Sequence, residues 1–345
     1  MSLLFSPYTT RSVTLRNRIV LSPMCMYSAT EEGVATDWHL VHYGARAAGG
    51  AGLILLEATA VEPRGRISTA DLGLYHEAQL PALERIVRFI HDQGAAAGVQ
   101  LAHAGRKAFT AQKGFGPQQP VAPSPIPFAP DWRVPEALDE AGLEAVAGSF
   151  ARAARWAHEV GFDVIELHMA HGYLLHQFLS PVANQRADGW GGSLERRMAF
   201  PLEVARRVRA VWPQEKPLFV RISTTDYVAG GFDPDQAVEV ARHLAQAGVD
   251  LVDCSSGGIA PVAPPTYPGY QLKAAERVRR EAGVPVGAVG LITTPELAEE
   301  VLQNGRADLI FLGRELLRHP SWPLDAARVL GDQAPWPRQY ERAKI

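Results

Sequence analysis

Three histidines and a tyrosine stand close together in the stretch ELHMAHGYLLHQFLS, residues 166–180. Side chains of these types can ligate a metal, fill the core as hydrogen-bonded groups, or donate hydrogen bonds to a substrate. A metal pair would need His168 and His171 on one helical face, but the stretch follows an apolar run, contains Gly172 and has no obvious third ligand. The sequence therefore disfavours a metal site, and His176, within LLHQFLS, is predicted to be a core histidine.

His168 and His171 fit better as a pair of hydrogen-bond donors. Two imidazole N–H groups that converge on one oxygen stabilise the negative charge that develops there during a reaction. Tyr173, two residues further along, carries a phenolic proton that can be transferred beside such a polarised group. The sequence thus predicts a carbonyl clamp next to a proton donor.

Arg221 also points to a particular chemistry. It lies inside the predicted strand 218–222, so its permanent positive charge needs an electron-rich partner. One interpretation is a structural ion pair with a carboxylate such as Glu166. The other is a ring that accumulates negative charge, as a reduced flavin does, with Gln100 supplying amide hydrogen bonds to the ring. Beside a flavin, the clamp and the proton donor describe addition of hydride and proton across an activated double bond.

Two glycine-rich turns predict a phosphate site. GAVG ends at Gly290, and FLGRELLRHP places Gly313 and Arg314 at the start of a helix. Backbone N–H groups of such turns bind anions, and an adjacent arginine adds a charge-assisted hydrogen bond. Glycines also shape ordinary turns, but two turns and an arginine together favour phosphate.

The elements that must position these residues alternate between strands and helices. Helical spacing with a closing glycine is found in 81–94, 143–161 and 235–248. The alternation predicts an α/β fold, a single-domain (β/α)8 TIM barrel with its reactive residues beyond the carboxyl ends of the strands, rather than a doubly wound open sheet. Eight short apolar runs are predicted to be parallel strands: 19–22, 53–57, 98–102, 163–167, 218–222, 250–254, 284–289 and 308–312.

The longest segment without clear regular structure runs from Lys107 to about Glu136 and contains GFGPQQPVAPSPIPFAPDW. Strands continue undisturbed on both sides of this Pro-rich segment. It is therefore predicted to be a loop over the active face.

The composition excludes several classes of protein. A net charge of −3 and a pI near 6.4 give no basic footprint for nucleic acid. No apolar run approaches the roughly 20 residues of a membrane helix, and the N-terminus lacks signal-peptide features, so we expect a cytoplasmic protein without a membrane partner. Cys25 and Cys254 are the only cysteines, which excludes a disulfide framework and a four-cysteine iron–sulfur cluster.

Five long motifs run through the chain: LRNRIVLSPMCMYS, QLAHAGRK, FDVIELHMAHGYLLHQFLSPVANQRADGWGGS, NGRADLIFLGRELLR and QYER. In these motifs the chain resembles the Old Yellow Enzyme family of FMN-dependent ene-reductases, and most closely its bacterial thermophilic-like branch. The resemblance covers essentially the whole chain and implies one FMN-binding barrel domain, residues 1–345, with NADPH, or alternatively NADH, as reductant. The implied substrates are α,β-unsaturated aldehydes, ketones, maleimides and nitroalkenes.

The resemblance also implies roles for individual residues. His168 and His171 would bind the carbonyl or nitro oxygen of the substrate, and Tyr27 would contact the substrate. Tyr173 would give a proton to the α-carbon while N5 of reduced FMN gives hydride to the β-carbon. Cys25 would adjust the reduction potential of the flavin. FMN would contact Ser22, Pro23, Met24, Cys25, Ala58, Gln100, Arg221, Gly290, Gly313 and Arg314, with the serines of CSSGG near its phosphate.

The C-terminal tail, about 331–345, resembles the tail of that branch, whose arginine reaches into a neighbouring subunit's pocket. Arg342 of QYER is the matching residue, so the resemblance implies a homodimer or homotetramer with Arg342 in a shared pocket. Ala343, Lys344 and Ile345 follow it here in place of the aromatic residue that often ends the branch.

Two other functions fit a flavin barrel. An FMN-dependent hydroxy-acid oxidase would use a histidine as base and would need a convergent pair of arginines, and the order HMAH then Tyr173 speaks against it. A flavin redox sensor without turnover would use Cys25 as its sensing thiol. Turnover of a simple enone distinguishes an ene-reductase from such a sensor.

Overall fold

Eight parallel strands close into a barrel in the computed structural model, which describes residues 2–108 and 119–344. Neighbouring strands pair all the way round in the order β10-β11-β12-β3-β4-β5-β8-β9, and β9 pairs with β10 to close the ring. Each of the eight predicted runs forms one strand, so the (β/α)8 prediction is confirmed and the open sheet is excluded. The strands are β3 (Ile19–Leu21), β4 (Leu53–Ala60), β5 (Ala96–Ala102), β8 (Val164–Met169), β9 (Leu218–Ser223), β10 (Leu251–Ser255), β11 (Val286–Ala288) and β12 (Leu309–Leu312).

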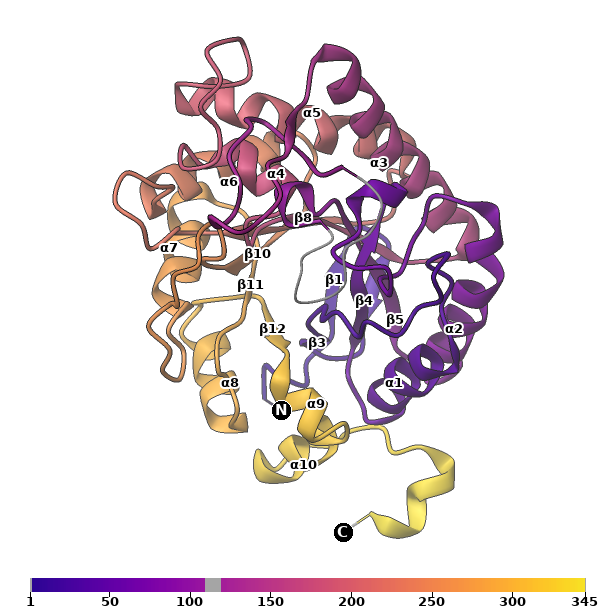
Figure 1. Ribbon diagram of the computed structural model, residues 1–345. Helices are drawn as coiled ribbons and strands as arrows, with labels where there is room; N and C mark the ends of the chain where they lie inside the picture. The colour runs from indigo at the N-terminus through magenta and orange to yellow at the C-terminus, as the bar shows by residue number, and fades with distance from the viewer. Residues whose placement is uncertain (1, 109–118, 345) are drawn as a thin grey trace.

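Helices surround the barrel (Figure 1). Gly161 caps α3 with φ 97°, and Gly94 and Gly248 lie in the same left-handed region just beyond α2 and α6, so the predicted helix ends are confirmed. None of the helices in the described ranges is both long enough and apolar enough to cross a membrane. The helices are α1 (Asp37–Ala48), α2 (Leu80–Asp92), α3 (Glu140–Val160), α4 (Leu174–Leu179), α5 (Leu194–Val211), α6 (Pro234–Gln246), α7 (Leu272–Ala282), α8 (Pro295–Gln303), α9 (Arg314–Arg318) and α10 (Trp322–Val329), with 3₁₀ turns η1 (Pro63–Gly65), η2 (Glu77–Gln79), η3 (Gly105–Lys107) and η5 (Arg338–Ala343).

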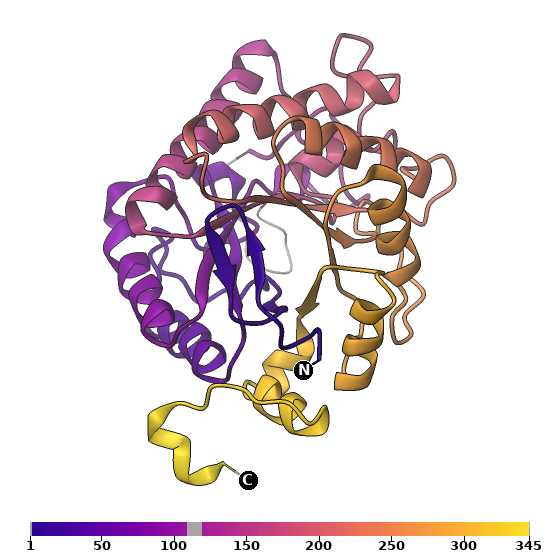
Figure 2. The same ribbon diagram turned by 180° about the vertical axis from the view of Figure 1, so that it is seen from behind.

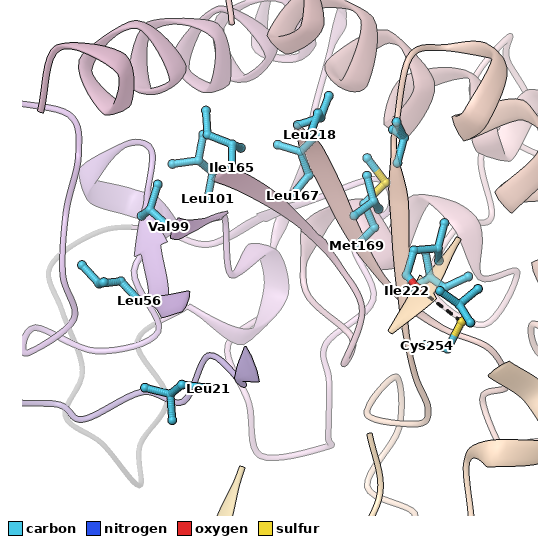
Figure 3. Close-up of a cluster of buried hydrophobic side chains, with 14 of the residues drawn as sticks. Leu21, Leu56, Val99, Leu101, Ile165, Leu167, Met169, Leu218, Ile222 and Cys254 are labelled. Carbon is cyan, nitrogen blue, oxygen red and sulfur yellow. Dashed lines mark hydrogen bonds between the residues drawn. The ribbon is translucent and has the colours of Figure 1, made fainter. Parts of the chain in front are cut away.

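The strands bury side chains on both faces. Inward-pointing side chains such as Phe219 and Phe311 fill the barrel interior. Outward-pointing side chains, such as those of Leu21 and Cys254, form a layer between the strands and the helices (Figure 3). Burial on both faces is the reason that the strands read as nearly continuous apolar runs in the sequence.

A hairpin that the sequence did not predict closes the amino end of the barrel. Strands β1 (Tyr8–Thr10) and β2 (Val13–Leu15) pair antiparallel, and Figure 2 shows them in front of the barrel when it is viewed from behind. Leu15 joins the interior cluster, and Tyr8 and Val13 pack against it. The hairpin therefore covers the apolar floor of the barrel, which is the layer of apolar side chains at the amino end of its interior.

The Pro-rich segment contacts the active face, as predicted, at Ile126 and Phe128. Residues 109–118 of that segment lie outside the described residues. Beyond those residues, Ile126 O accepts a hydrogen bond from Arg106 Nη1 at 3.3 Å, and the ring centroid of Phe128 lies 4.6 Å from Lys107 Nζ. Two short strands, β6 (Val121–Ala122) and β7 (Glu136–Ala137), form a small parallel sheet that was not predicted.

Candidate functional site

Polar side chains occupy the barrel interior at the carboxyl ends of the strands. Alternate residues point inward along each strand, so Glu166 and His168 of β8 stand above the apolar floor. Strand register places Gln100 beside Glu166. It also places Arg221 between His168 and Asp253. Residues from four strands thus meet in one layer.

A pocket opens above this layer. Its empty volume is about 640 Å³, part of which is open to solvent. Ser255 of the predicted CSSGG stretch lines this pocket. Three further lining residues were not predicted from the sequence: Tyr270, Gln271 and Arg318. Five residues predicted individually also line it: His171, Arg221, Gly290, Gly313 and Arg314.

A tight turn carries the histidine pair out of β8. His168 is still part of the strand, whereas His171 has φ 58° and Gly172 has φ 72°. A Cβ at Gly172 would lie 2.1 Å from the carbonyl oxygen of Gly258, so the close approach of the two loops requires glycine. His171 N–H donates to Ser223 Oγ at 3.0 Å. The turn is therefore held between the end of β9 and the loop that follows β10.

Both imidazoles of the pair are neutral at pH 7. Burial, and then the charge of Arg221, hold the pKa of His168 and of His171 well below the usual value. His168 Nδ1 accepts a hydrogen bond from Ala170 N–H at 3.2 Å, which places the ring proton on Nε2. His171 Nε2 lies 2.7 Å from Ser255 Oγ. The ring centroids are 5.2 Å apart with an angle of 84° between the planes, so the two rings share one region of the site.

Tyr173 keeps its proton beside these rings. It is the N-cap residue of α4, and its ring centroid lies 4.8 Å from that of His168. Burial raises the pKa of Tyr173 well above 10, and electrostatic interactions with Cys25 and Asp71 raise it further. Tyr173, Cys25 and Tyr27 pack against one small apolar cluster, which brings three predicted site residues together. The phenol is therefore a proton donor rather than a base at neutral pH.

Arg221 does have a carboxylate partner, and it is Asp253. Arg221 Nε lies 2.9 Å from Asp253 Oδ2, whereas Glu166 Oε1 accepts a hydrogen bond from Gln100 Nε2 at 2.7 Å. Burial raises the pKa of both Glu166 and Asp253, and the Arg221 charge opposes that rise. Arg221 still lines the pocket, so its ion pair and an electron-rich ligand are compatible partners.

The two glycine turns line the same pocket as Arg221. Gly290 has φ 127°, and a Cβ there would lie 3.0 Å from Gln271 Nε2, so a side chain would be strained and would narrow the pocket. Gly313 is the N-cap residue of α9, directly before Arg314. A buried cation and two glycine turns with an adjacent arginine, all lining one pocket, fit a flavin ring and its phosphate. The residues present therefore fit FMN.

The segment after β3 lies beside the turn that contains Gly313. Ser22 N–H donates to Leu312 O at 3.0 Å, and a Cβ at Gly313 would lie 3.4 Å from Met24 Sδ. The stretch 22–25 therefore runs beside the second glycine turn, as a shared FMN contact requires. Ala58 lines a separate small cavity together with Tyr173.

A buried carboxylate supports this segment and was not predicted. Glu57 Oε2 accepts a hydrogen bond from Met26 N–H at 2.5 Å. Glu57 Oε1 lies 3.1 Å from His39 Nε2 and accepts from Tyr43 Oη at 3.2 Å. A glutamate inside the apolar run LILLE was the one local signal of this network.

Other predicted residues lie away from the pocket. His176 is fully buried, accepts from Gly172 N–H at 2.8 Å and has Nε2 3.0 Å from Asp226 Oδ1, so it is the core histidine that was predicted. Arg342 lies in η5, which has no buried residue and lies outside the ring of helices in this single chain (Figure 1). Among the described residues, no group of three or more His, Cys, Asp or Glu side chains could hold a metal ion.

Comparisons with known proteins agree with this geometry. The profile of the NADH:flavin oxidoreductase / NADH oxidase family matches residues 3–333. The chain is 51% identical over 344 residues to the NADPH dehydrogenase of Listeria monocytogenes serotype 4a (strain HCC23), covering 99% of each chain. It is 52% identical over 342 residues to the NADPH dehydrogenase of Geobacillus thermodenitrificans (strain NG80-2), covering 99% of this chain and 98% of the relative.

Solved structures show the same similarity. Morphinone reductase in complex with tetrahydroNAD superposes with a TM-score of 0.80 at 28% identity, covering 97% of this chain and 92% of that chain. The old yellow enzyme homologue from Zymomonas mobilis superposes with a TM-score of 0.81 at 27% identity, covering 99% and 98%. The similarity extends over the whole barrel in both cases.

Proposed function

The chain belongs to the NADH:flavin oxidoreductase / NADH oxidase family, and from that premise we propose that it reduces activated C=C bonds. Its membership confirms the resemblance to Old Yellow Enzyme and makes it an FMN-dependent NADPH dehydrogenase. The proposed substrates are α,β-unsaturated aldehydes, ketones, maleimides and nitroalkenes. The observation that carries the proposal is the arrangement of two neutral imidazoles beside a protonated phenol at the edge of the pocket.

Each residue of the site would have a defined role in substrate binding or proton transfer. His168 and His171 bind the carbonyl or nitro oxygen of the substrate through imidazole N–H groups, and Tyr27 contacts the substrate. FMN, when bound, would supply to the β-carbon the hydride that NADPH provides. Tyr173 gives its phenolic proton to the α-carbon and then takes another proton from solvent. The pocket wall and the part of the Pro-rich loop that the structure describes would exclude water from the reacting atoms.

The proposed FMN contacts follow the geometry of the pocket. Arg221 lines the pocket, and Gln100 lies beside Glu166 in the polar layer of the barrel. Both would contact the ring. Gly290, Gly313 and Arg314 would bind the phosphate. The Cys25 thiol would adjust the reduction potential. Ser22, Pro23, Met24 and Ala58 would complete the contacts.

Replacement of Arg314 by methionine should raise the Kd for FMN by about tenfold, because one charge-assisted hydrogen bond to the phosphate is lost. The measurement is a titration of apoprotein with FMN, followed by quenching of flavin fluorescence. Arg280→Met is the matched control, since Arg280 lies on α7 with a mostly exposed side chain and pairs with Glu276. An unchanged Kd in the Arg314 variant would remove this residue from the phosphate site.

The decisive test of the proposed function is an anaerobic spectrum of the purified holoprotein. NADPH should bleach the visible flavin bands, and 2-cyclohexenone should restore them. A redox sensor would bleach without recovery by the enone, and a hydroxy-acid oxidase would instead be bleached by a 2-hydroxy acid. Bleaching by NADPH without recovery by an enone, a maleimide or a nitroalkene would overturn the proposal.

The homodimer or homotetramer with Arg342 in a neighbouring pocket stays a prediction, as does the cytoplasmic location. The exposed position of Arg342 on η5 supports a role outside its own subunit. Light scattering of the full chain and of a variant ending at residue 330 would report the oligomeric state. A truncated chain with the same number of subunits per particle and the same enone kinetics would contradict the shared pocket.

A further inference from the structure

The ammonium group of Lys107 has an unusual environment beside the proton donor. Lys107 ends the 3₁₀ turn η3 that follows β5, and it is partly buried. Its Nζ donates to the carbonyl oxygens of His171 at 2.9 Å and of Gly258 at 3.2 Å. Within the described ranges no carboxylate forms an ion pair with it, so its charge is balanced by carbonyl dipoles and aromatic rings. A lysine that only solubilised this surface would extend into water instead.

The same ammonium group lies over the ring of Tyr173. The distance from Nζ to the Tyr173 ring centroid is 5.1 Å, and the distance to the Phe128 ring centroid is 4.6 Å. A cation at this distance from a desolvated phenol interacts weakly with the neutral ring but strongly with a phenolate. The contact therefore favours the state in which Tyr173 has given its proton away.

We propose that Lys107 is a positioning residue for proton transfer: it fixes the turn that carries His171 and Tyr173 against Gly258, and its charge stabilises the Tyr173 phenolate. This inference rests on the proposed function. In the step concerned, the O–H bond of Tyr173 breaks and its electron pair stays on the phenolate oxygen. The proton forms a C–H bond with the electron pair left at the α-carbon after hydride addition. The phenolate then takes a proton from solvent.

The charge on Lys107 should be lost in mildly alkaline solution. Loss of solvation, and then the nearby charge of Arg106, lower the pKa of Lys107 to about 8. The ammonium is therefore present below about pH 8 and disappears above it, so the proton-transfer step should slow as pH rises through this value. Reduction of FMN by NADPH needs no proton from Tyr173 and should keep its rate.

The pKa values of the other groups that face Lys107 or Tyr173 differ from that of Lys107. The pKa values of His168 and His171 are held well below the usual value by burial, and that of Tyr173 is raised well above 10. Burial lowers the pKa of Arg106 to about 10. Burial also raises the pKa of Asp71 to about 6. The Cys25 thiol faces Tyr173 from the segment after β3, so the pH profile is to be repeated in a Cys25→Ala background.

The test separates the two half-reactions of the holoenzyme in an anaerobic stopped-flow instrument between about pH 6 and pH 10. Reduced enzyme is mixed with 2-cyclohexenone, and oxidised enzyme with NADPH. Lys107→Met should slow enone-dependent reoxidation by at least about tenfold and abolish the alkaline decline, while reduction by NADPH changes little. Lys107→Arg should recover most of the rate and move the decline to higher pH. Lys273→Met, an exposed lysine on α7, is the matched control.

A second measurement does not depend on turnover. Lysines of the oxidised holoenzyme are labelled by reductive ¹³C-methylation, and the resonance missing from Lys107→Arg identifies Lys107. Its titration midpoint should coincide with the alkaline decline of the reoxidation rate. Because it uses the wild-type fold, this comparison decides the matter even if Lys107→Met fails to fold or to retain FMN.

The outcomes are distinguishable. Failure of the wild-type enzyme to be reoxidised by the enone would overturn the proposed function itself. If the wild type turns over and Lys107→Met reoxidises equally fast, the inference on Lys107 alone is overturned. It is also overturned if Lys107→Met is slow but keeps the alkaline decline, or if the Lys107 resonance titrates near the ordinary lysine value of about 10.4.

Discussion

Tyr173→Phe should slow the reoxidation of reduced enzyme by 2-cyclohexenone by roughly 10²–10⁴-fold and leave its reduction by NADPH nearly unchanged. The change removes only the hydroxyl group, so the ring can keep its packing against the cluster that contains Ile67 and Ala104. The proton for the α-carbon must then come from a poorly placed water molecule. Single-turnover stopped-flow measurements of both half-reactions would show the difference.

The control for this variant is Tyr75→Phe, which removes a phenol that donates to Glu32 O at 3.2 Å, away from the pocket. A nitroalkene offers a second contrast. Its nitro group holds the negative charge left by hydride addition, so protonation can follow release, and Tyr173→Phe should slow this substrate much less. Equal slowing of both half-reactions would indicate damage to the FMN site, and no slowing would assign the proton to another group.

The barrel could be predicted because its evidence is local. Strands such as Leu53–Ala60 and Leu218–Ser223 are buried on both faces and appear as apolar runs in the sequence. The rule that reactive residues follow the carboxyl ends of strands then brought His171 and Arg314 into one pocket. The hairpin Tyr8–Leu15 escaped prediction because each of its strands has only three residues, too few to show a period.

The partners within the site could not be predicted, because they depend on strand register. Arg221 pairs with Asp253 since register places the two residues side by side on β9 and β10. A register shifted by one residue would turn one of them outward. Lys107 gave no signal either, because its partners belong to turns that lie about 60 to 150 positions away in the chain. Local sequence identifies the reactive groups, and tertiary packing decides what surrounds them.

The other large effect on enone reduction is expected when an imidazole of the His168–His171 pair is removed. His168→Leu should lower kcat/KM for 2-cyclohexenone by about 10²–10³-fold, because one of the donors to the developing oxyanion is removed. The loss should fall mainly on the rate of hydride transfer rather than on substrate binding, since the oxygen carries most charge in the transition state. His168→Asn, which keeps an N–H donor, should recover part of it. His243→Leu, a half-exposed histidine of α6, is the control.

The two histidines should also be non-additive. A His168→Leu/His171→Leu enzyme should lose less than the product of the two single losses, because both groups act on the same oxygen. Since burial keeps the pKa of both imidazoles well below the usual value, the hydride-transfer rate should not follow an imidazole titration between about pH 6 and pH 8. A rate that fell as pH rose through about 6.5 would mean that an imidazolium ion activates the substrate, and the neutral donor pair would be wrong.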